Sequence, residues 1–390
     1  MNSLALILAA VSLLIWVVLT FLRGAFWQLL AFDDDIAKQE SLAQWPRVVT
    51  IVPARNEAET IARTVESLVK QNYAGELGLV VVDDHSDDGT GALAREAAER
   101  LEASERVLIL QSAALESGWT GKLLAMQQGV ETGAARDADY FWFTDADIEH
   151  APDTLRRVVQ RAEKDKLDLV SLMVLSQVQS FPERLLIPPF LYFFLKLYPP
   201  NWTASRKRKT AGAAGGCVLL KREALERIGG LAAIRGEVID DCTLARAVKR
   251  TGGGLWMGLT RKSVSLRTYA SFREIQDLIA RTAFTQLGYS GLALAGTLLG
   301  MFVTYLLPVI FTFSARPVLW RLGLAAWALM AITYLPTIRF YRMSPLWAAA
   351  LPVAAAFYTY ATWLSAVRYW LGRGGQWKGR AQAPVKSSAD

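Results

Sequence analysis

The chain has 390 residues, of which 52% are hydrophobic, and a formal net charge of +7. This length accommodates one large soluble domain together with membrane segments, and the hydrophobic fraction is high for a soluble enzyme. Contact with anionic lipid headgroups accounts for the positive charge, and no nucleic-acid-binding module is visible, so nucleic acid is excluded as an expected partner. The two cysteines, Cys217 and Cys242, lack CxxC spacing, and we expect both to be free and buried.

A long uncharged stretch opens the chain. Residues 4–22 form an apolar run of about 19 residues, enough to cross the hydrocarbon core of a membrane as a helix. A cleaved signal peptide is the alternative, but it needs a basic n-region, and residues 1–3 carry no charged side chain. Three further long apolar stretches follow residue 290, at approximately 291–313, 318–338 and 346–367. We therefore expect a multi-pass protein of the inner cell membrane.

The positive-inside rule gives this arrangement an orientation. Arg23 follows the first apolar stretch and nothing basic precedes it, so we expect the N-terminus outside and residues 24–290 in the cytoplasm. Four crossings would then leave the basic tail outside, against the same rule. One of the four apolar stretches is therefore expected to be re-entrant or interfacial. The sequence does not distinguish which of the four it is. The expected division is an N-terminal transmembrane anchor (1–23), a central domain (45–290), a membrane-spanning region (291–370) and a basic tail (371–390).

From residue 47 onward, short apolar runs alternate with amphipathic segments. Strands are predicted at 48–52, 79–82, 107–110 and 140–143. Helices are predicted after Asn56 as N-cap, with Glu59 reaching back, and around 93–101 and 122–131. The alternation predicts an α/β domain with a mostly parallel, Rossmann-like sheet covered on both faces. No G-x-G-x-x-G follows the first strand and no Walker A motif occurs, which disfavours the ordinary dinucleotide and P-loop folds.

Carboxylates stand at or near the strand ends. Asp145 and Asp147 follow the aromatic strand at 140–143, at the edge of the sheet where open α/β folds bind ligands. Two hard oxygen ligands at this spacing suit Mg²⁺ or Mn²⁺ when substrate phosphates complete the octahedron. Asp83 and Asp84 can accept hydrogen bonds from a nucleobase or ribose, and the pair Asp240–Asp241 can take a proton from an acceptor hydroxyl. A helix N-cap or a solvated turn explains any one of these clusters alone, but hardly all three.

Three motifs resemble the successive signatures of family 2 glycosyltransferases, the inverting enzymes of the GT-A fold. They are Ile51–Glu57 (IVPARNE), Val81–Thr90 (VVDDHSDDGT) and Thr144–Asp147 (TDAD). Within that family, the anchor, the C-terminal spans and the ending Trp377–Arg380 are most similar to the hopene-associated glycosyltransferases. The resemblance covers roughly 45–290, and it implies a nucleotide-sugar half at 45–150 and an acceptor half at 151–290.

The resemblance also implies a set of site residues. Asp145 and Asp147 would hold the metal, Mg²⁺ or Mn²⁺, and Asp241 would be the catalytic base beside Asp240. The nucleotide-sugar pocket would be formed by Pro53, Ala54, Arg55, Glu57, Asp83, Asp84, Gly121, Lys122 and Asp145. The family's Gln-x-x-Arg-Trp motif is absent, and Arg281 and Gln286, on a predicted amphipathic helix, are its expected substitutes. This departure argues against a processive polysaccharide synthase.

We therefore expect a metal-dependent, inverting hexosyltransferase that moves a sugar from a nucleotide-diphosphate sugar, with UDP as the expected nucleotide, to a lipid hydroxyl. Hopanoid or related glycolipid biosynthesis is the setting that the resemblance implies. Two alternatives stay open. A polyprenyl-phosphate glycosyltransferase would have an acceptor that needs no base, and a non-catalytic membrane scaffold would keep the fold without turnover.

Two segments in the second half of the domain have the composition of segments that contact a membrane surface. Residues 181–200 are aromatic and aliphatic, interrupted by Pro188–Pro189, and fit an interfacial segment, with a buried core helix as the alternative. The basic run 206–209 follows, and next to such a segment it could attract anionic lipid or substrate phosphate, although a solvated loop is the default. Of the two histidines, His85 is predicted near the nucleotide or packed behind it, and His150 at a helix cap or surface.

Overall fold

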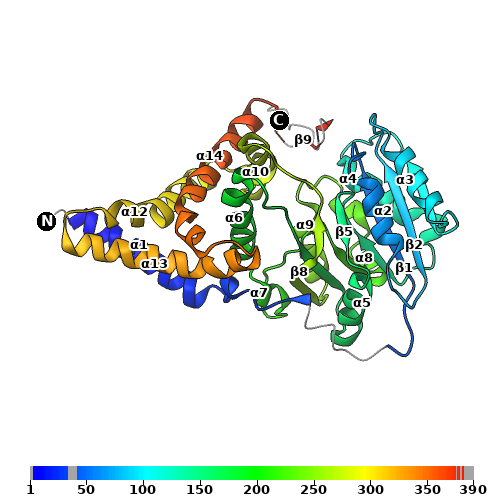
Figure 1. Cartoon of the computed structure of the whole chain (residues 1–390), viewed down its shortest axis with the longest axis horizontal. Coiled ribbons are helices and arrows are strands. Elements are labelled where there is room, and N and C mark those ends of the chain that lie inside the picture. Colours follow the sequence, from blue (N-terminus) through cyan, green and yellow to red (C-terminus); the bar gives the residue numbers. More distant parts are fainter. Residues whose placement is uncertain (1–2, 34–41, 375, 378–379, 382–390) are drawn as a thin grey trace.

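The protein, in a computed structural model that describes residues 3–33, 42–374, 376–377 and 380–381, has two parts. An α/β domain lies at one end, and a tapering bundle of apolar helices lies at the other, with the N-terminus at its tip (Figure 1). The domain contains the helices α2 (Ile61–Val69), α3 (Thr90–Arg100), α4 (Gly121–Glu131), α5 (Thr154–Asp165), α8 (Arg222–Arg227) and α9 (Asp240–Arg250).

The described part of the domain is built on one eight-stranded sheet, with the strand order β3-β2-β1-β4-β7-β6-β8-β5. β1, β2, β3 and β4 pair in parallel, as do β6 and β8, whereas β7 and β5 are antiparallel to their neighbours. The mixed, mostly parallel sheet confirms the predicted fold class. Its strands are β1 (Val48–Ala54), β2 (Leu77–Asp83), β3 (Val107–Gln111), β4 (Tyr140–Phe143), β5 (Ile148–His150), β6 (Leu169–Leu175), β7 (Val218–Lys221) and β8 (Leu255–Ser265).

The central strands are buried on both faces. Every residue of β1 is buried, and its side chains alternate between two cores. Val48 and Val52 pack in the core that contains residues of α2, α3 and α5. Val49 and Ile51 pack in the core that contains residues of α4 and α9. This explains why the strands appear in the sequence as continuous apolar runs.

The first helix of the domain begins later than predicted. Asn56 is not its N-cap, because it has a positive φ of 49° and lies in the turn before the helix. Its side-chain oxygen accepts a hydrogen bond from the backbone N–H of Asp87 at 3.1 Å, and its own N–H donates to Ser86 at 2.9 Å. The helix begins at Ile61 with Thr60 as N-cap. Asn56 therefore joins the loop after β1 to the acidic turn after β2.

Four helices of the described chain are long and apolar enough to span a membrane. They are α1 (Ser3–Leu22), the continuous helix Gly291–Thr312, α13 (Pro317–Phe340), and Pro345–Trp370, which includes α14 (Leu351–Trp370). The helix Gly291–Thr312 consists of α11 (Gly291–Met301), a π-helical turn (Phe302–Leu306) and α12 (Leu307–Thr312). Large apolar side chains such as Leu4, Leu14 and Phe21 are 61 to 70% exposed along α1. Such a surface suits lipid rather than water.

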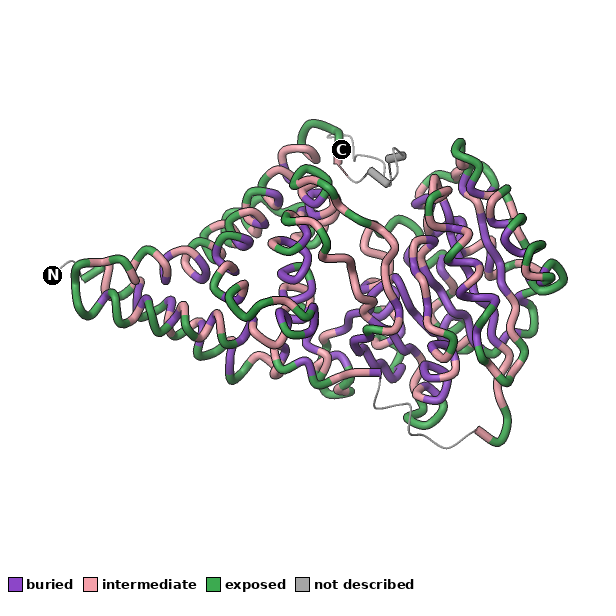
Figure 2. The backbone as a smooth tube through the Cα atoms, in the orientation of Figure 1, coloured by how far each residue is buried: buried purple, intermediate pink, exposed green. Residues whose placement is uncertain are grey.

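The helices nearest the domain are arranged differently. α6 (Phe181–Leu197), α7 (Pro200–Ala204) and α10 (Phe272–Gln286) lie between the bundle and the sheet (Figure 1). α13 packs mainly on α1 and α12, but α14 packs mainly on α10 and also contacts α11 and α6. Arg368 of α14 forms an ion pair with Asp277 of α10 at 2.6 Å. Figure 2 shows that buried residues are concentrated in the sheet and in this junction, whereas the outer bundle is largely exposed.

α6 continues as one helix through Pro188 and Pro189, and both prolines are buried. The central residues of its length, from Leu186 to Leu195, contribute to the core shared with α13 and α14. The buried-helix alternative thus describes the packing of α6, while contact of this segment with a membrane interface stays a prediction.

The segment behind α1 is attached to the sheet. The backbone N–H of Leu259 in β8 donates to Ala31 at 2.8 Å, and Phe32 forms a β-bridge with Leu259. Asp33, which is fully buried, pairs with the equally buried Arg157 of α5 at 3.0 Å and accepts a hydrogen bond from Thr260 at 2.8 Å. The segment that follows α1 is therefore fixed to the domain by a buried ion pair as well as by the chain.

Candidate active site

Asp145 and Asp147 lie at the carboxyl end of β4, where the chain leaves the sheet. The turn that carries them is held by Thr144, whose hydroxyl contacts the carbonyl of Gly216 at 2.9 Å and the imidazole of His150 at 2.8 Å. His150 is buried, and its other ring nitrogen contacts Ser263 at 2.9 Å. The prediction of a capping or surface role for His150 is therefore wrong. Burial lowers its pKa to about 3, so the ring is neutral and supports the turn from behind.

Lys122 joins the carboxylates of two elements. Thr120 caps α4 through its side chain, so Gly121 and Lys122 form the first turn of that helix. The ammonium of Lys122 lies 2.8 Å from Asp145 and 3.2 Å from Asp240. Burial alone would lower the pKa of Lys122, but the two carboxylates raise it above its ordinary value. Lys122 is therefore a buried, permanently charged centre between the end of β4 and the start of α9.

Asp240 and Asp241 occupy the first turn of α9. The carboxylate of Asp241 accepts hydrogen bonds from the backbone N–H groups of Gly215 at 2.9 Å and of Cys242 at 2.7 Å. Burial and the neighbouring charge of Asp240 raise the pKa of Asp241 to about 6, against the opposing effect of Lys122. A carboxylate with such a pKa can accept a proton near neutral pH. Asp145, Lys122, Asp240 and Asp241 line one recess together with Pro53 and Gly215.

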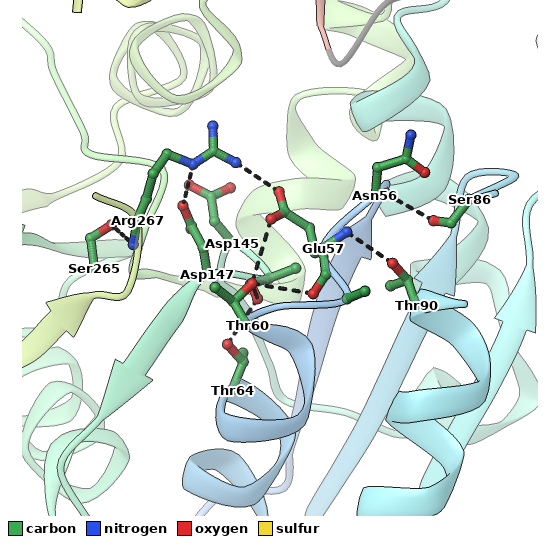
Figure 3. Close-up of polar contacts among 12 residues, drawn as sticks. Asn56, Glu57, Thr60, Thr64, Ser86, Thr90, Asp145, Asp147, Ser265 and Arg267 are labelled. Carbon is green, nitrogen blue, oxygen red and sulfur yellow. Dashed lines mark hydrogen bonds and ion pairs between the residues drawn. The ribbon is translucent and has the colours of Figure 1, made fainter. Parts of the chain in front are cut away.

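Arg267, which sequence reasoning missed, closes the other side of the site. It follows β8, and its guanidinium lies 3.2 Å from Asp147 and 3.0 Å from Glu57 (Figure 3). Burial alone would lower the pKa of Arg267, but Asp147 and Glu57 raise it. A basic residue after a strand is too common to be a signal on its own. Only the pairing of β5 with β8, which brings residues 265 and 148 into register, shows its place.

Cations also set the charge of Asp145. Burial would raise the pKa of Asp145, but Lys122, and more weakly Arg281 and Arg267, lower it below its ordinary value. Arg281 of α10 is therefore close enough to act on the carboxylate site. Gln286 is engaged elsewhere, because its amide donates to the hydroxyl of Tyr198 at 2.8 Å. The structure thus brings Arg281, but not Gln286, toward the carboxylates.

The remaining predicted nucleotide residues lie at the ends of β1 and β2. Arg55 donates to the carbonyl oxygens of Asp84 and His85, and Asp84 is buried beneath it. The carboxylate of Asp83 accepts a hydrogen bond from the backbone of Ser86 at 3.0 Å. Pro53 and Ala54 are the last two residues of β1. These residues form a rim next to Glu57. Both cysteines are buried free thiols, as predicted.

The charges around Asp145 and Asp147 fit a divalent cation. Five carboxylates, those of Glu57, Asp145, Asp147, Asp240 and Asp241, face the cations Lys122 and Arg267. The excess of negative charge favours an additional cation. Among the described residues no group of three or more His, Cys, Asp or Glu side chains is arranged to hold a metal. A metal at Asp145 and Asp147 would therefore need further oxygen ligands from a bound diphosphate, as is usual for Mg²⁺.

Known proteins resemble this domain in sequence and in fold. Residues 49–229 match the model of the family described as glycosyl transferase family 2. Just under half of the chain is therefore similar to a family 2 glycosyltransferase domain. Probable glycosyltransferase YdaM of Bacillus subtilis is 31% identical over 119 residues, which are 27% of this chain and 28% of that protein. Polyprenol monophosphomannose synthase of Mycolicibacterium smegmatis is 32% identical over 117 residues, which are 30% of this chain and 41% of that protein.

The matched segments thus span less than half of the length of these two relatives. Among solved structures, the mannosyltransferase PcManGT from Pyrobaculum calidifontis, in complex with GDP-Man and Mn²⁺, is similar with a TM-score of 0.54 and 20% sequence identity. The likeness covers 90% of this chain and 99% of that one, so the shared fold includes apolar helices as well as the domain. These findings establish the GT-A-type fold.

The Arg267 bridge generates the first prediction. Arg267→Gln should leave Asp147 and Glu57 as neighbouring carboxylates without their shared cation, at a cost of about 2 kcal/mol. The melting temperature of the detergent-purified protein in EDTA should fall by roughly 2 to 4 °C. Mn²⁺ should restore more stability to this variant than to the wild type, because it supplies the missing positive charge.

The matched control is Arg63→Gln, which removes an exposed guanidinium paired with Glu149. It should change the melting temperature little, with or without Mn²⁺. Equal effects of the two substitutions would refute a special role for the Arg267 bridge.

Proposed function

We propose that this protein is a membrane-bound, inverting glycosyltransferase that moves a sugar from a nucleotide-diphosphate sugar to a lipid acceptor. The observation that carries the proposal is the single recess shared by Asp145 and Asp241. One carboxylate stands where a diphosphate-bound cation fits, and the other has a pKa of about 6 and can accept a proton. Lys122 contacts Asp145 directly and is close enough to Asp241 for the charge of that carboxylate to raise its pKa.

In the proposed reaction, Asp241 removes the proton of an acceptor hydroxyl as its oxygen attacks the anomeric carbon. The bond to the nucleoside diphosphate breaks on the opposite face, so the configuration at the anomeric carbon inverts. Lys122 and Arg281 are near enough to offset the negative charge of the departing diphosphate. Mg²⁺ or Mn²⁺, held by Asp145 and Asp147, would supply Lewis-acid stabilisation of the same charge.

The rim formed by Pro53, Ala54, Arg55, Asp83 and Asp84 is the proposed nucleotide pocket. The diphosphate is proposed to lie against Glu57, Gly121 and Lys122, because Lys122 contacts Asp145 and Glu57 shares Arg267 with Asp147. The proposed donor is a nucleoside diphosphate sugar. The expectation that it is a UDP-sugar is best tested by comparing the activity with UDP-sugars and with GDP-mannose. Gln286, which is bonded to Tyr198, is assigned a structural role in this proposal.

The acceptor is proposed to be a lipid because the domain is attached to apolar helices by α6, α7 and α10. A lipid hydroxyl, such as that of a hopanoid-type alcohol, is the acceptor that makes use of a base at Asp241. A polyprenyl phosphate is the second candidate, and the name of the M. smegmatis relative favours it. Its oxygen is already anionic, so this reaction would not need Asp241.

Replacement of the base tests the proposal and separates these acceptors. In protein reconstituted in vesicles, Asp241→Asn should lower the transfer of labelled sugar to an extractable lipid alcohol by a factor of 10² to 10⁴. Nucleotide-dependent thermal stabilisation should persist, because the donor site is intact. Asp137→Asn, which changes an exposed carboxylate, is the matched control and should retain full activity.

If the Asp241→Asn variant still transfers sugar to polyprenyl phosphate, the acceptor is a phosphate and not a hydroxyl. Loss of transfer activity in Asp240→Asn but not in Asp241→Asn would show that Asp240 is the base. Absence of turnover with every UDP- and GDP-sugar, with or without Mn²⁺, would favour the non-catalytic scaffold.

The pH dependence of the reaction follows from the raised pKa of Asp241. Below about pH 6 the carboxylate is protonated and cannot act as a base, so kcat/KM should fall about tenfold per pH unit. Asp240→Asn removes a like charge beside Asp241, so the fall in kcat/KM should begin at a lower pH. Lys122→Met removes a stabilising cation and should move it to higher pH. Profiles that coincide in all three proteins would exclude Asp241 as the titrating group.

We further propose that the chain crosses the inner membrane three times and that its catalytic domain is cytoplasmic. α1, Gly291–Thr312 and α13 would be the crossings. α14 would lie at the cytoplasmic interface, since it packs on α10 and its Arg368 pairs with Asp277. This arrangement brings the basic tail to the inside, in agreement with the positive-inside rule.

The topology can be read from reporters joined to the C-terminus. A green fluorescent protein fusion should be bright and an alkaline phosphatase fusion inactive, because the tail is expected in the cytoplasm. A fusion truncated after residue 314, which lies between the second and third crossings, should give the opposite result. An active phosphatase fused to the full-length chain would place the C-terminus outside and so favour four crossings over three.

A further inference from the structure

Several cations lie on the segments that follow α1 and α7 and in the last turn of α6. We define the basic cluster as Arg23, Lys196, Arg206, Lys207, Arg208 and Lys209. They come from the end of α1, the last turn of α6 and the loop after α7. Within the described residues, none of the six forms an ion pair with a carboxylate. The last four are exposed. These six cations thus have no carboxylate partner among the described residues, and the proposed reaction uses none of them.

Trp202 of α7 brings two members of the basic cluster together. The guanidinium of Arg23 is 4.7 Å from the centre of its indole ring, and that of Arg208 is 4.9 Å from it. The indole N–H has no hydrogen-bond acceptor among the described residues. Two guanidinium groups held on one ring repel each other, and an anion that binds both would relieve the repulsion.

The positions of Arg23 and Lys196 are set by the fold. Arg23 donates to the backbone carbonyl of Lys196 at 3.0 Å, at the carboxyl end of α6. The ammonium of Lys196 donates to the hydroxyl of Tyr305, which belongs to the π-helical turn of Gly291–Thr312, at 2.7 Å. Both cations are therefore fixed before any ligand arrives. The exposed loop 206–209 could close over the same ligand.

The place of the basic cluster indicates what it binds. Arg23 is the first charged residue after the uncharged helix α1, and α7 lies near this end of α1 in Figure 1. The end of an apolar helix marks the boundary of the hydrocarbon core, where the phosphates of lipid headgroups lie. Arginine and tryptophan are suited to this boundary, because one pairs with phosphate and the other has an apolar ring with a polar edge.

The basic cluster is separate from the candidate active site. Lys249, near the carboxyl end of α9, donates to the carbonyls of Trp202 at 3.1 Å and Thr203 at 2.6 Å. Asp241 lies at the other end of α9, about 12 Å away along the helix axis. A phosphate bound between Arg23 and Arg208 is therefore too distant to react at Asp241. This separation favours a lipid of the membrane itself over a phosphorylated acceptor.

We propose that the basic cluster binds the phosphate headgroup of an anionic phospholipid in the leaflet next to the domain. The bound headgroup holds α1, α6 and α7 together at the membrane boundary and so sets the height of the domain above the lipid. Each cation near an anionic surface contributes about 1 kcal/mol. The proposal does not depend on the proposed function, because binding can be measured without a donor or an acceptor.

Native mass spectrometry of the detergent-purified full chain tests the proposal. The probes are phosphatidylglycerol, which is anionic, and phosphatidylcholine, which has no net charge. The wild type should bind phosphatidylglycerol at least tenfold more tightly. The variant Arg206→Gln/Arg208→Gln/Lys209→Gln should lose about fivefold in affinity for each cation removed, or on the order of a hundredfold in total.

The matched control is Arg95→Gln/Arg100→Gln/Arg136→Gln, which removes the same charge from exposed positions. Two of them lie on α3, at the end of the domain away from the helix bundle (Figure 1). It should bind phosphatidylglycerol as the wild type does. If the triple loop variant proves unstable in a thermal melt, the single variant Arg208→Gln should still show the fivefold loss.

Three results would overturn the proposal. One is equal binding of the two lipids, and another is equal loss of binding in the loop variant and the control. The third is complete displacement of phosphatidylglycerol by millimolar inorganic phosphate, which would identify a site for the free anion. Loss of glycosyl transfer with normal lipid binding would affect the proposed function alone.

Discussion

One buried ammonium, that of Lys122, holds the carboxylates of the candidate site together. Asp145 comes from the end of β4 and Asp240 from the start of α9, and their like charges would separate these elements if no cation lay between them. The sheet provides the framework for this contact. β4 and β1 are neighbours at its centre, α4 covers β1, and the Thr120 cap aims the first turn of α4 at the carboxylates. The arrangement of the domain can be understood as the support of this one charge cluster.

The same balance of charge explains how the site can be both stable and reactive. Lys122 and Arg267 neutralise the carboxylates in part, and the pocket keeps an excess of negative charge. Asp145 is held ionised, while Asp241, more distant from the cation and beside Asp240, has a raised pKa. Two aspartates of the same recess thus differ in proton affinity because of their surroundings, and this difference suits one to a metal and the other to a proton.

Local patterns allowed the elements to be predicted, whereas contacts between distant segments could not be. The buried strands around 48–52 and 140–143 have continuous apolar runs, and these need no tertiary information. Asn56 was wrongly predicted as a helix cap, because a positive φ and a bond to Asp87 leave no local pattern. His150 was wrongly predicted as a cap or surface residue, because β5 has only three residues and shows no alternation. Arg267 was missed for a related reason. Its partners are about 120 and 210 residues away, and the ladder between β5 and β8 brings it to them.

The buried pair of Asp33 and Arg157 has a consequence for the order in which the protein assembles. Asp33 also bonds to Thr260, 227 residues further along the chain. At about 5 to 20 residues per second, the ribosome needs roughly 10 to 45 seconds to make the intervening chain. During that interval α1 has already been synthesised, but the strand that receives the segment behind it does not yet exist. Arg157 emerges in the middle of this period, and it can hold Asp33 before β8 arrives. The first apolar helix is thus made at the start of synthesis but acquires its final attachment only when the sheet is complete.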